Sequence, residues 1–334
     1  MSSWLAEVQE TERTDKPGEL RLRCLRCACE LAEITVNRGE GLPEAVRCSE
    51  CGWEMRSENG IWDAMLPERA QHFQKFVADY EHVRQAEGRG SNDAEYYLAL
   101  PYRDLSGRNR QQWEIRAKTW KYLELRLLPE LRRELGRPLH VLDLGAGNGW
   151  MSYRLSLAGD RAVAVDLLVN EQDGLGAAKQ YTARLASPFP RFQAELDRLP
   201  FADGQFDCAI FNASFHYSEN YERTMKEAMR CIAPHGRVIV ADTAWYRKAE
   251  SGEQMVAEKQ AAFRKKYGFT SNAIESREYL TDDRLRQLAV RLGIRWEAYK
   301  PWYGVRWAMR PWVARWKRRR EPSQFRIYVG RVEA

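Results

Sequence analysis

The stretch Val141-Leu-Asp-Leu-Gly145-Ala-Gly147-Asn-Gly149-Trp150 decides the fold of this 334-residue chain. An apolar run ends at Leu144, glycines follow, and a helical pattern begins near Asn148. Gly145 permits a tight turn, and Gly147 lets a ligand approach the backbone without a Cβ in the way. The free N–H groups at the start of the helix can bind that ligand. The stretch therefore predicts a strand, a binding loop and a helix in succession.

The same alternation of apolar runs and helical stretches continues along the chain. The expected strands are 139–144, 161–166, 191–196, 206–212 and 236–242, and the expected helices are 148–158, 174–185 and 220–231. Mostly apolar strands separated by helices indicate a parallel sheet that is covered on both faces. We therefore predict a doubly wound, Rossmann-like α/β fold.

The acids around the loop indicate which ligand it binds. Asp166 ends the second strand, where a carboxylate can accept hydrogen bonds from two ribose hydroxyls. The glycine spacing is G-x-G-x-G rather than the dinucleotide pattern G-x-G-x-x-G, and Asp143 precedes the first glycine by two residues. An acid there would repel pyrophosphate and suit an ammonium or sulfonium group. A glycine-rich turn without a ligand is the alternative.

These residues resemble the first motif of the class I S-adenosylmethionine (SAM)-dependent methyltransferases, and further motifs follow. Ala164-Val-Asp166 resembles the second motif, Glu195-Leu-Asp197-Arg-Leu-Pro-Phe201 the third, and Cys231-Ile-Ala-Pro-His-Gly236 the run into the fifth strand. The resemblance covers 135–243, 279–285 and a final strand at 325–332, and it is closest to small-molecule enzymes such as the quinone-biosynthesis methyltransferases. It implies a seven-stranded sheet in which 294–299 is parallel to the preceding strands.

The resemblance also implies the residues that hold SAM. They are Asp143, Gly145, Ala146, Gly147, Asp166, Leu167, Asp197, Arg198 and Asn212, with Arg116 from a preceding lid. In the family the acid at Asp166 binds the ribose, and the acid at Asp197 meets the adenine amino group. Ligands lie beyond the carboxyl ends of the strands, so residues 212–217 should face the donor methyl. No Pro-Pro follows Asn212, which counts against N-methylation of adenine or cytosine.

His216 lies in that last segment and is a candidate general base. An imidazole has an ordinary pKa near 6.5 and can take the proton that a hydroxyl or acidic carbon loses. A packing or hydrogen-bonding role is the equal alternative. The sequence shows no geometry that separates the two.

Four cysteines near the N-terminus have the spacing of a metal site. Cys24-x-x-Cys27 and Cys48-x-x-Cys51 are separated by 20 residues, which predicts a structural four-cysteine zinc ribbon without an open catalytic position. Cys29 could replace Cys27, although its spacing from Cys24 fits less well. A unit this small buries too little apolar surface to fold without the metal. It also resembles the zinc-ribbon proteins that partner and activate tRNA and protein methyltransferases.

The segment 300–320 combines cations with tryptophan and contains no acid. Its cations are Lys300, Arg306, Arg310, Arg315, Lys317, Arg318, Arg319 and Arg320. Val305, Met309, Trp312 and Trp316 recur at helical spacing, and Pro311 predicts two short helices rather than one. The cations indicate an anionic acceptor or a membrane surface, and the alternative is a solvated basic face over packed aromatic rings.

The whole sequence predicts four regions. They are a polar tail (1–18), the zinc ribbon (19–67), a helical linker and SAM lid (68–136) and a methyltransferase core (137–334), in which insertions 244–280 and 300–324 shape the acceptor site. The formal net charge of +6 does not by itself demand nucleic acid. No apolar run is long enough for a transmembrane helix, and the first residues lack a signal-peptide pattern, so we expect a cytoplasmic protein.

Three functions fit these features. The first is a SAM-dependent methyltransferase with a small-molecule or lipid-like, anionic acceptor, with O- or C-methylation favoured. The second is an RNA methyltransferase that grips phosphate with the ribbon and the basic segment. The third is a non-catalytic SAM-binding scaffold that recruits a partner through the ribbon. The acids at 143, 166 and 197 argue against the scaffold.

Overall fold

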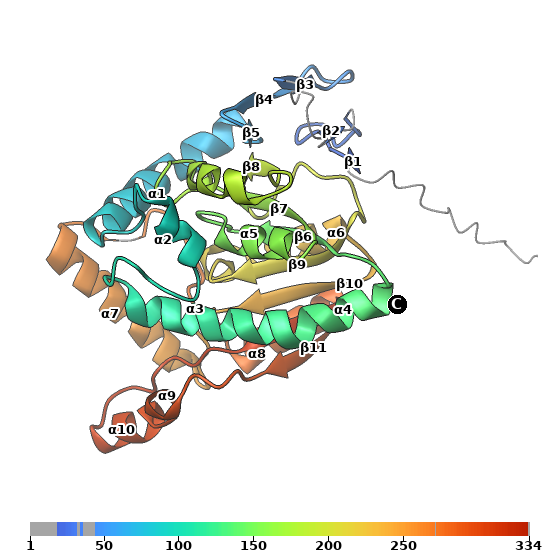
Figure 1. Cartoon of the computed structure of the whole chain (residues 1–334). Helices are drawn as coiled ribbons and strands as arrows, with labels where there is room; N and C mark the ends of the chain where they lie inside the picture. The colour runs from blue at the N-terminus through green and yellow to red at the C-terminus, as the bar shows by residue number, and fades with distance from the viewer. Residues whose placement is uncertain (1–18, 32–33, 36–43, 271, 333–334) are drawn as a thin grey trace, which may run out of the picture.

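One large sheet with helices on both faces forms the body of the molecule (Figure 1). The computed structural model describes residues 19–31, 34–35, 44–270 and 272–332. The strand order of the sheet is β11-β12-β10-β9-β6-β7-β8-β5-β4-β3. The predicted polar tail 1–18 lies outside the described residues.

Seven of these strands form the predicted Rossmann-like sheet. They are β6 (His140–Leu144), β7 (Arg161–Asp166), β8 (Arg191–Gln193), β9 (Phe206–Asn212), β10 (Ile232–Ala241), β11 (Ile294–Tyr299) and β12 (Ile327–Val332). Strands β8, β7, β6, β9 and β10 are parallel. Strand β12 is antiparallel to both β10 and β11, so β11 runs in the same direction as β10. The α/β fold and the direction predicted for 294–299 are confirmed.

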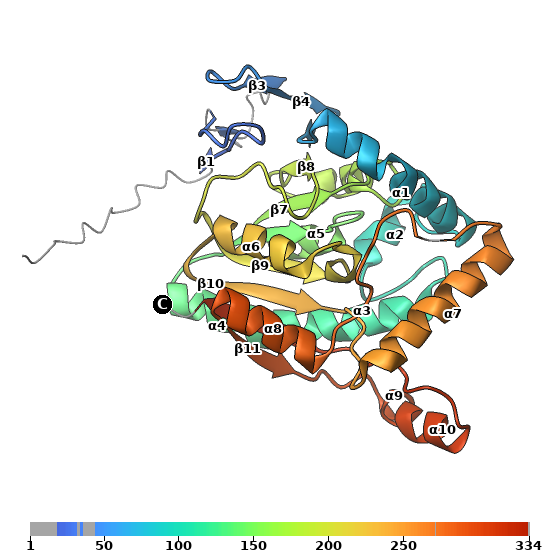
Figure 2. The same cartoon turned by 180° about the vertical axis from the view of Figure 1, so that it is seen from behind.

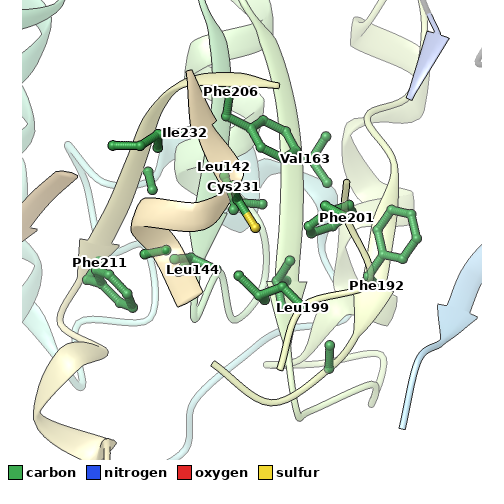
Figure 3. Close-up of a cluster of buried hydrophobic side chains, with 14 of the residues drawn as sticks. Leu142, Leu144, Val163, Phe192, Leu199, Phe201, Phe206, Phe211, Cys231 and Ile232 are labelled. Atoms are coloured by element: carbon green, nitrogen blue, oxygen red, sulfur yellow. The ribbon is translucent and has the colours of Figure 1, made fainter. Parts of the chain in front are cut away.

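Side chains alternate along the central strands into two buried cores. Leu142 and Leu144 of β6 join Phe211 of β9 on one face (Figure 3), which α6 (Tyr221–Cys231) and α8 (Asp282–Leu292) cover. Val141 and Ile210 point to the other face, which is covered by α2 (Ala94–Ala99), α3 (Arg110–Tyr122), α4 (Leu128–Leu135) and α5 (Trp150–Leu157). Burial on both faces explains why these strands are apolar throughout.

The remaining helical segments refine the expected pattern. Helix α1 (Pro67–Ala86) precedes α2, a π-helical turn (Leu123–Leu127) joins α3 to α4, and α7 (Ala249–Tyr267) follows β10. Gly136, with φ of 64°, ends α4. The helix expected at 174–185 is a 3-10 helix (Leu175–Arg184). A close backbone approach accompanies it, since a Cβ on Gly176 would lie 2.7 Å from the Val169 carbonyl oxygen.

The cysteine-rich region extends the sheet instead of standing apart from it. It contains β1 (Glu19–Leu20), β2 (Ile34–Thr35), β3 (Ala45–Arg47), β4 (Glu54–Glu58) and β5 (Ile61–Asp63). Strand β5 pairs in parallel with β8, and β4 and β3 follow in antiparallel order. This attachment was not predicted from the sequence, because no local pattern specifies which strand an edge strand will pair with.

The basic segment lies at the other end of the molecule. It forms two short helices, α9 (Val305–Ala308) and α10 (Arg310–Trp316), with Pro311 in the first turn of α10 as predicted. Figures 1 and 2 show both helices projecting beyond the body near α7. They follow β11, the edge strand opposite β3. Among the described residues, no helix combines the length and the apolar character needed to cross a bilayer.

Candidate active site and metal centre

The glycine loop after β6 is held by its own backbone. Gly145, Gly147 and Gly149 have φ values of 77°, 56° and 76°, in the left-handed region that favours glycine. The N–H groups of Gly145 and Ala146 donate to the Val165 carbonyl oxygen at 2.8 and 2.9 Å, which ties the loop to the end of β7. A Cβ on Gly145 would lie 2.2 Å from the Cβ of Ser214. The loop therefore requires glycine at this position.

Asp166 stands beside this loop with a fixed carboxylate. Its Oδ2 accepts from the Gly147 N–H at 2.7 Å, and its Oδ1 accepts from the Leu168 N–H at 2.9 Å. Burial raises the pKa of Asp166 above its ordinary value. Each carboxylate oxygen keeps a further lone pair. The side chain is thus oriented and can still accept hydrogen bonds from a ligand.

A cavity opens over the carboxyl ends of β6, β7, β8 and β9. It holds about 800 Å³ of space not occupied by protein atoms, part of it open to solvent. Seven of the predicted SAM-binding residues line it, namely Gly145, Ala146, Gly147, Asp166, Leu167, Asn212 and Arg116. This is the edge of a doubly wound sheet where ligands bind.

Helix α1 lines the same cavity, which the sequence analysis missed. Phe76, Tyr80 and Arg84 follow one another at intervals of four residues and so share one face of the helix. Arg69, near the start of α1, forms an ion pair with Glu195 at 2.7 Å, and Arg84 forms one with Asp173. The four-residue spacing was visible in the sequence, but nothing there showed that this polar helix returns to the cavity.

Two polar groups in the cavity have no partner in the described part of the chain. The Oδ1 atom of Asn212 is buried and accepts no hydrogen bond. Arg116 forms no ion pair with any described acid, and its guanidinium lies 4.8 Å from the ring centroid of Trp113. Burial, followed by the nearby cations Arg84 and Arg89, lowers the pKa of Arg116. An acceptor and a cation are therefore available to a ligand.

Three predicted SAM-binding residues do not line the cavity. Asp143 is buried behind the loop, where its Oδ2 accepts from the Ser152 hydroxyl at 2.8 Å and burial raises its pKa to about 7. Asp197 forms an ion pair with Arg223 at 3.0 Å, and Arg198 lies 3.6 Å from Glu195. After β8 the chain turns Ala194 and Leu196 toward the cavity in their place.

His216 is half-buried beside Tyr217 and does not line the cavity, although its Nδ1 atom is buried. It lies in a 3-10 turn (Phe215–Tyr217), its Nδ1 has no described hydrogen-bond partner, and its ring centroid is 4.2 Å from that of Tyr217. Burial lowers the pKa of His216 to about 4. The imidazole is therefore neutral at neutral pH.

A second cavity adjoins the first and shares four residues with it. The shared residues are Phe76, Tyr80, Arg84 and Tyr217. The second cavity holds about 830 Å³, part of it open to solvent, between α1 and α7. Its lining includes three acidic and three basic side chains together with aromatic rings such as Phe263.

The four predicted zinc ligands come together. The sulfurs of Cys24, Cys27, Cys48 and Cys51 all lie within 4.8 Å of one another, and two pairs are separated by 3.4 and 3.5 Å. Tetrahedral zinc with Zn–S bonds of about 2.3 Å needs sulfurs about 3.8 Å apart. The Cys51 N–H points at the sulfur of Cys48 and lowers its pKa to about 7, which favours the thiolate that binds metal. Cys29 is not part of the cluster.

A glycine loop after the first strand, an acid after the second and a cavity above both define a nucleoside-binding α/β domain. Residues 142–240 match a protein family described as a methyltransferase domain. This chain therefore contains a class I SAM-dependent methyltransferase domain, joined to a cysteine cluster that is compatible with a zinc ribbon.

Curated relatives match mainly this domain. The sterol 4-C-methyltransferase strm-1 of Caenorhabditis elegans is 30% identical over 33% of this chain and 32% of its own length. A malonyl-[acyl-carrier protein] O-methyltransferase of Pseudescherichia vulneris is 29% identical over 41% of this chain and 51% of its own. The matches thus span about a third to a half of these relatives. A 1,6-didemethyltoxoflavin-N1-methyltransferase structure from Burkholderia thailandensis is 16% identical, with a TM-score of 0.46, over 87% of this chain and all of that one.

Proposed function

We propose that this chain is a SAM-dependent methyltransferase that acts on a small-molecule acceptor. The observation that carries the proposal is the cavity in which the left-handed glycine loop, the oriented Asp166 carboxylate and the unpaired Arg116 meet. When bound, SAM supplies a methyl group on a positively charged sulfur.

The polar groups of the cavity complement the groups of SAM. In this proposal Asp166 accepts hydrogen bonds from the ribose hydroxyls, and Arg116 pairs with the carboxylate of the methionine part. The free Oδ1 of Asn212 accepts from the ammonium group. Leu167 and Leu196 contact the base.

The second cavity is the proposed acceptor site, since it adjoins the first and both are lined by Tyr80 and Tyr217. Its cations already have carboxylate partners, as Lys259 pairs with Glu278 at 2.8 Å. Aromatic walls with balanced charge suit an acceptor with an apolar or planar body. The anionic acceptor expected from the sequence depended on the basic segment, which lines a different cavity.

Methyl transfer forms a bond from the acceptor oxygen or carbon to the methyl carbon and breaks the bond from that carbon to sulfur, whose electron pair stays on sulfur. The proton of the acceptor passes to solvent water, to which the cavities are partly open. O- or C-methylation stays favoured because no Pro-Pro follows Asn212. A pKa of about 4 makes His216 a weak base at neutral pH, and it does not line the cavity. We therefore assign His216 a role in positioning Tyr217. The acceleration of methyl transfer then comes from alignment of the two reactants.

The two alternatives receive less support from the arrangement. An RNA methyltransferase that used both the ribbon and the basic segment would need to span opposite edges of the sheet. A scaffold has no use for a second cavity that adjoins the donor cavity.

Calorimetry with S-adenosylhomocysteine on the zinc-loaded chain tests the donor site. Asp166→Asn should weaken binding about 10- to 100-fold. The asparagine amide places an NH₂ group against one of the two backbone N–H groups from which the carboxylate accepts hydrogen bonds. The control Asp283→Asn changes an exposed acid on α8 and should leave the affinity unchanged. Absence of binding to the wild-type chain would refute the proposal. Binding without methyl transfer across a panel of hydroxyl and carbon acceptors would favour the scaffold.

A further inference from the structure

Helices α9 and α10 expose an unusually apolar face. The exposed fractions are 68% for Trp302, 72% for Trp312 and 80% for Trp316, with Val305 and Met309 also more than half exposed. Large apolar side chains grouped at the surface of a protein mark interaction sites. The helices project from the body in both views (Figures 1 and 2), so this face is open to a large partner.

The projection is firmly anchored to the body. The Tyr303 carbonyl oxygen accepts from the Lys118 Nζ of α3 at 2.6 Å, and the Tyr303 hydroxyl bonds Thr119 at 2.8 Å. Trp307 stacks on Phe325 with ring centroids 5.3 Å apart. The inward side of the segment is thus packed. The outward-facing tryptophans are exposed, whereas neighbouring residues of the same segment pack against the body.

The same segment carries exposed cations, and four of them line a cavity on its α7 side. Arg306, Arg315, Lys317, Arg318 and Arg319 are exposed, and among the described residues none of them forms an ion pair. Arg320 is the exception, since it pairs with Glu258 at 2.6 Å. A basic cavity of about 1650 Å³, open to solvent, lies between α10 and α7.

Arg310 faces this basic cavity with an unsatisfied guanidinium. Its Nη1 is buried and has no described hydrogen-bond partner, and the group lies 3.9 Å from the ring centroid of Trp307. A buried donor of this kind is costly unless an acceptor reaches it. Arginine is well matched to the oxygens of a phosphate group.

Together these features match the interface of a lipid bilayer. Tryptophan is favoured at the boundary between headgroups and acyl chains, and cations beside it attract anionic lipids. RNA could stack on the tryptophans, but Val305 and Met309 offer no flat surface for a base. The apolar face projects from the body and includes aliphatic side chains, and unpaired cations lie on the same segment. These features favour a single partner that offers hydrocarbon to the apolar face and phosphate to the cations.

We propose that the α9–α10 projection docks this chain on anionic phospholipid membranes. Trp312, Trp316 and Met309 enter the boundary between headgroups and acyl chains, and the exposed arginines and lysine of the same segment bind lipid phosphates. This docking does not depend on methyl transfer.

Sedimentation of the full, zinc-loaded chain with vesicles tests the proposal without SAM. Vesicles of phosphatidylcholine with about 30% phosphatidylglycerol should bind the chain, pure phosphatidylcholine vesicles should bind it much less, and added salt should release it. Trp312→Ser with Trp316→Ser should lower the partition coefficient about tenfold or more. Arg318→Gln with Arg319→Gln should lower it about 25-fold, at about fivefold for each charge.

Matched controls separate docking from general surface effects. Val290→Ser changes a valine on α8 that is 86% exposed, and Arg133→Gln changes an exposed arginine on α4. Both should bind vesicles as the wild type does, and thermal unfolding should show that every variant is folded. Equal binding to neutral vesicles, or equal loss in the controls, would overturn the proposal. So would a dimer or an RNA complex that the tryptophan substitutions abolish while vesicles fail to bind.

Discussion

The donor cavity and the cysteine cluster are both formed by tight turns, but different forces hold them. The cavity rests on strands such as β9, every residue of which except Asn212 is buried. The cysteines are joined to strands of two to five residues, and in β3 only Val46 is buried. The cavity is preformed by burial on two faces of a sheet, whereas the cysteine cluster is predicted to depend on a bound metal ion.

Removal of the metal should have the largest effect, and it should affect the cysteine cluster but not the donor cavity. Zinc contributes about 10–16 kcal/mol to the folding of small cysteine sites. Chelation should therefore raise hydrogen exchange in residues 19–31 and 44–58, while β6 and β9 stay protected. Cys208→Ser provides a control outside the cluster. Unchanged exchange around the cysteines after verified metal loss would contradict this account.

Replacement of Gly145 by alanine tests how tightly the surrounding packing confines the glycine loop of the donor cavity. Gly145→Ala forces alanine into a left-handed conformation, at about 1–2 kcal/mol, and places its Cβ 2.2 Å from Ser214. Overpacking adds about 1–3 kcal/mol. Gly147→Ala is the matched control, because its φ is also positive but the nearest atom to its Cβ would lie at 3.6 Å.

Thermal unfolding and calorimetry with S-adenosylhomocysteine measure both effects. Gly145→Ala should lose more stability than Gly147→Ala, and the added change Ser214→Gly should restore part of it. Equal losses in the two alanine variants would mean that Ser214 does not confine the loop.

Substitution of Arg116 should weaken ligand binding without lowering the stability of the folded chain. Arg116→Met removes a partly buried cation without an ion-pair partner among the described residues, so stability should not fall. The affinity for S-adenosylhomocysteine should fall about 10- to 100-fold with the loss of a charged hydrogen-bond donor. The exposed Arg110→Met is the control. Unaltered affinity in Arg116→Met would remove this residue from the proposed donor site.

The same two regions show what sequence can predict. The glycine loop, Asp166 and the two C-x-x-C pairs are defined by short spacings, so their local geometry follows from the sequence. The face of α1 with Phe76 and Tyr80 is more than 60 residues away from the loop, and its contact with the cavity depends on tertiary packing. The pairing of β5 with β8 is equally non-local.

Asp197 shows a third limit. Its motif position suggested a place in the cavity, but β8 ends at Gln193 and Asp197 lies in the turn that follows, where it pairs with Arg223. Ala194 and Leu196 line the cavity instead. The role of Asp197 in binding SAM therefore stays a prediction.

Substitution of His216 should give the smallest effect, and the sign of that effect separates an imidazole with a lowered pKa from an ordinary base. Burial lowers its pKa in the folded chain to about 4, against about 6.5 when unfolded, so the unfolded state binds more protons between these values. The stability that the neutral His216 contributes is fully present above pH 6.5 and is lost as the pH falls toward 4. At pH 5.5, His216→Gln should therefore be more stable than the wild type by about 1 kcal/mol, with that advantage absent at pH 8. Histidine NMR should find no His216 titration between pH 5 and 8; a midpoint near 6.5 would restore it as a candidate base.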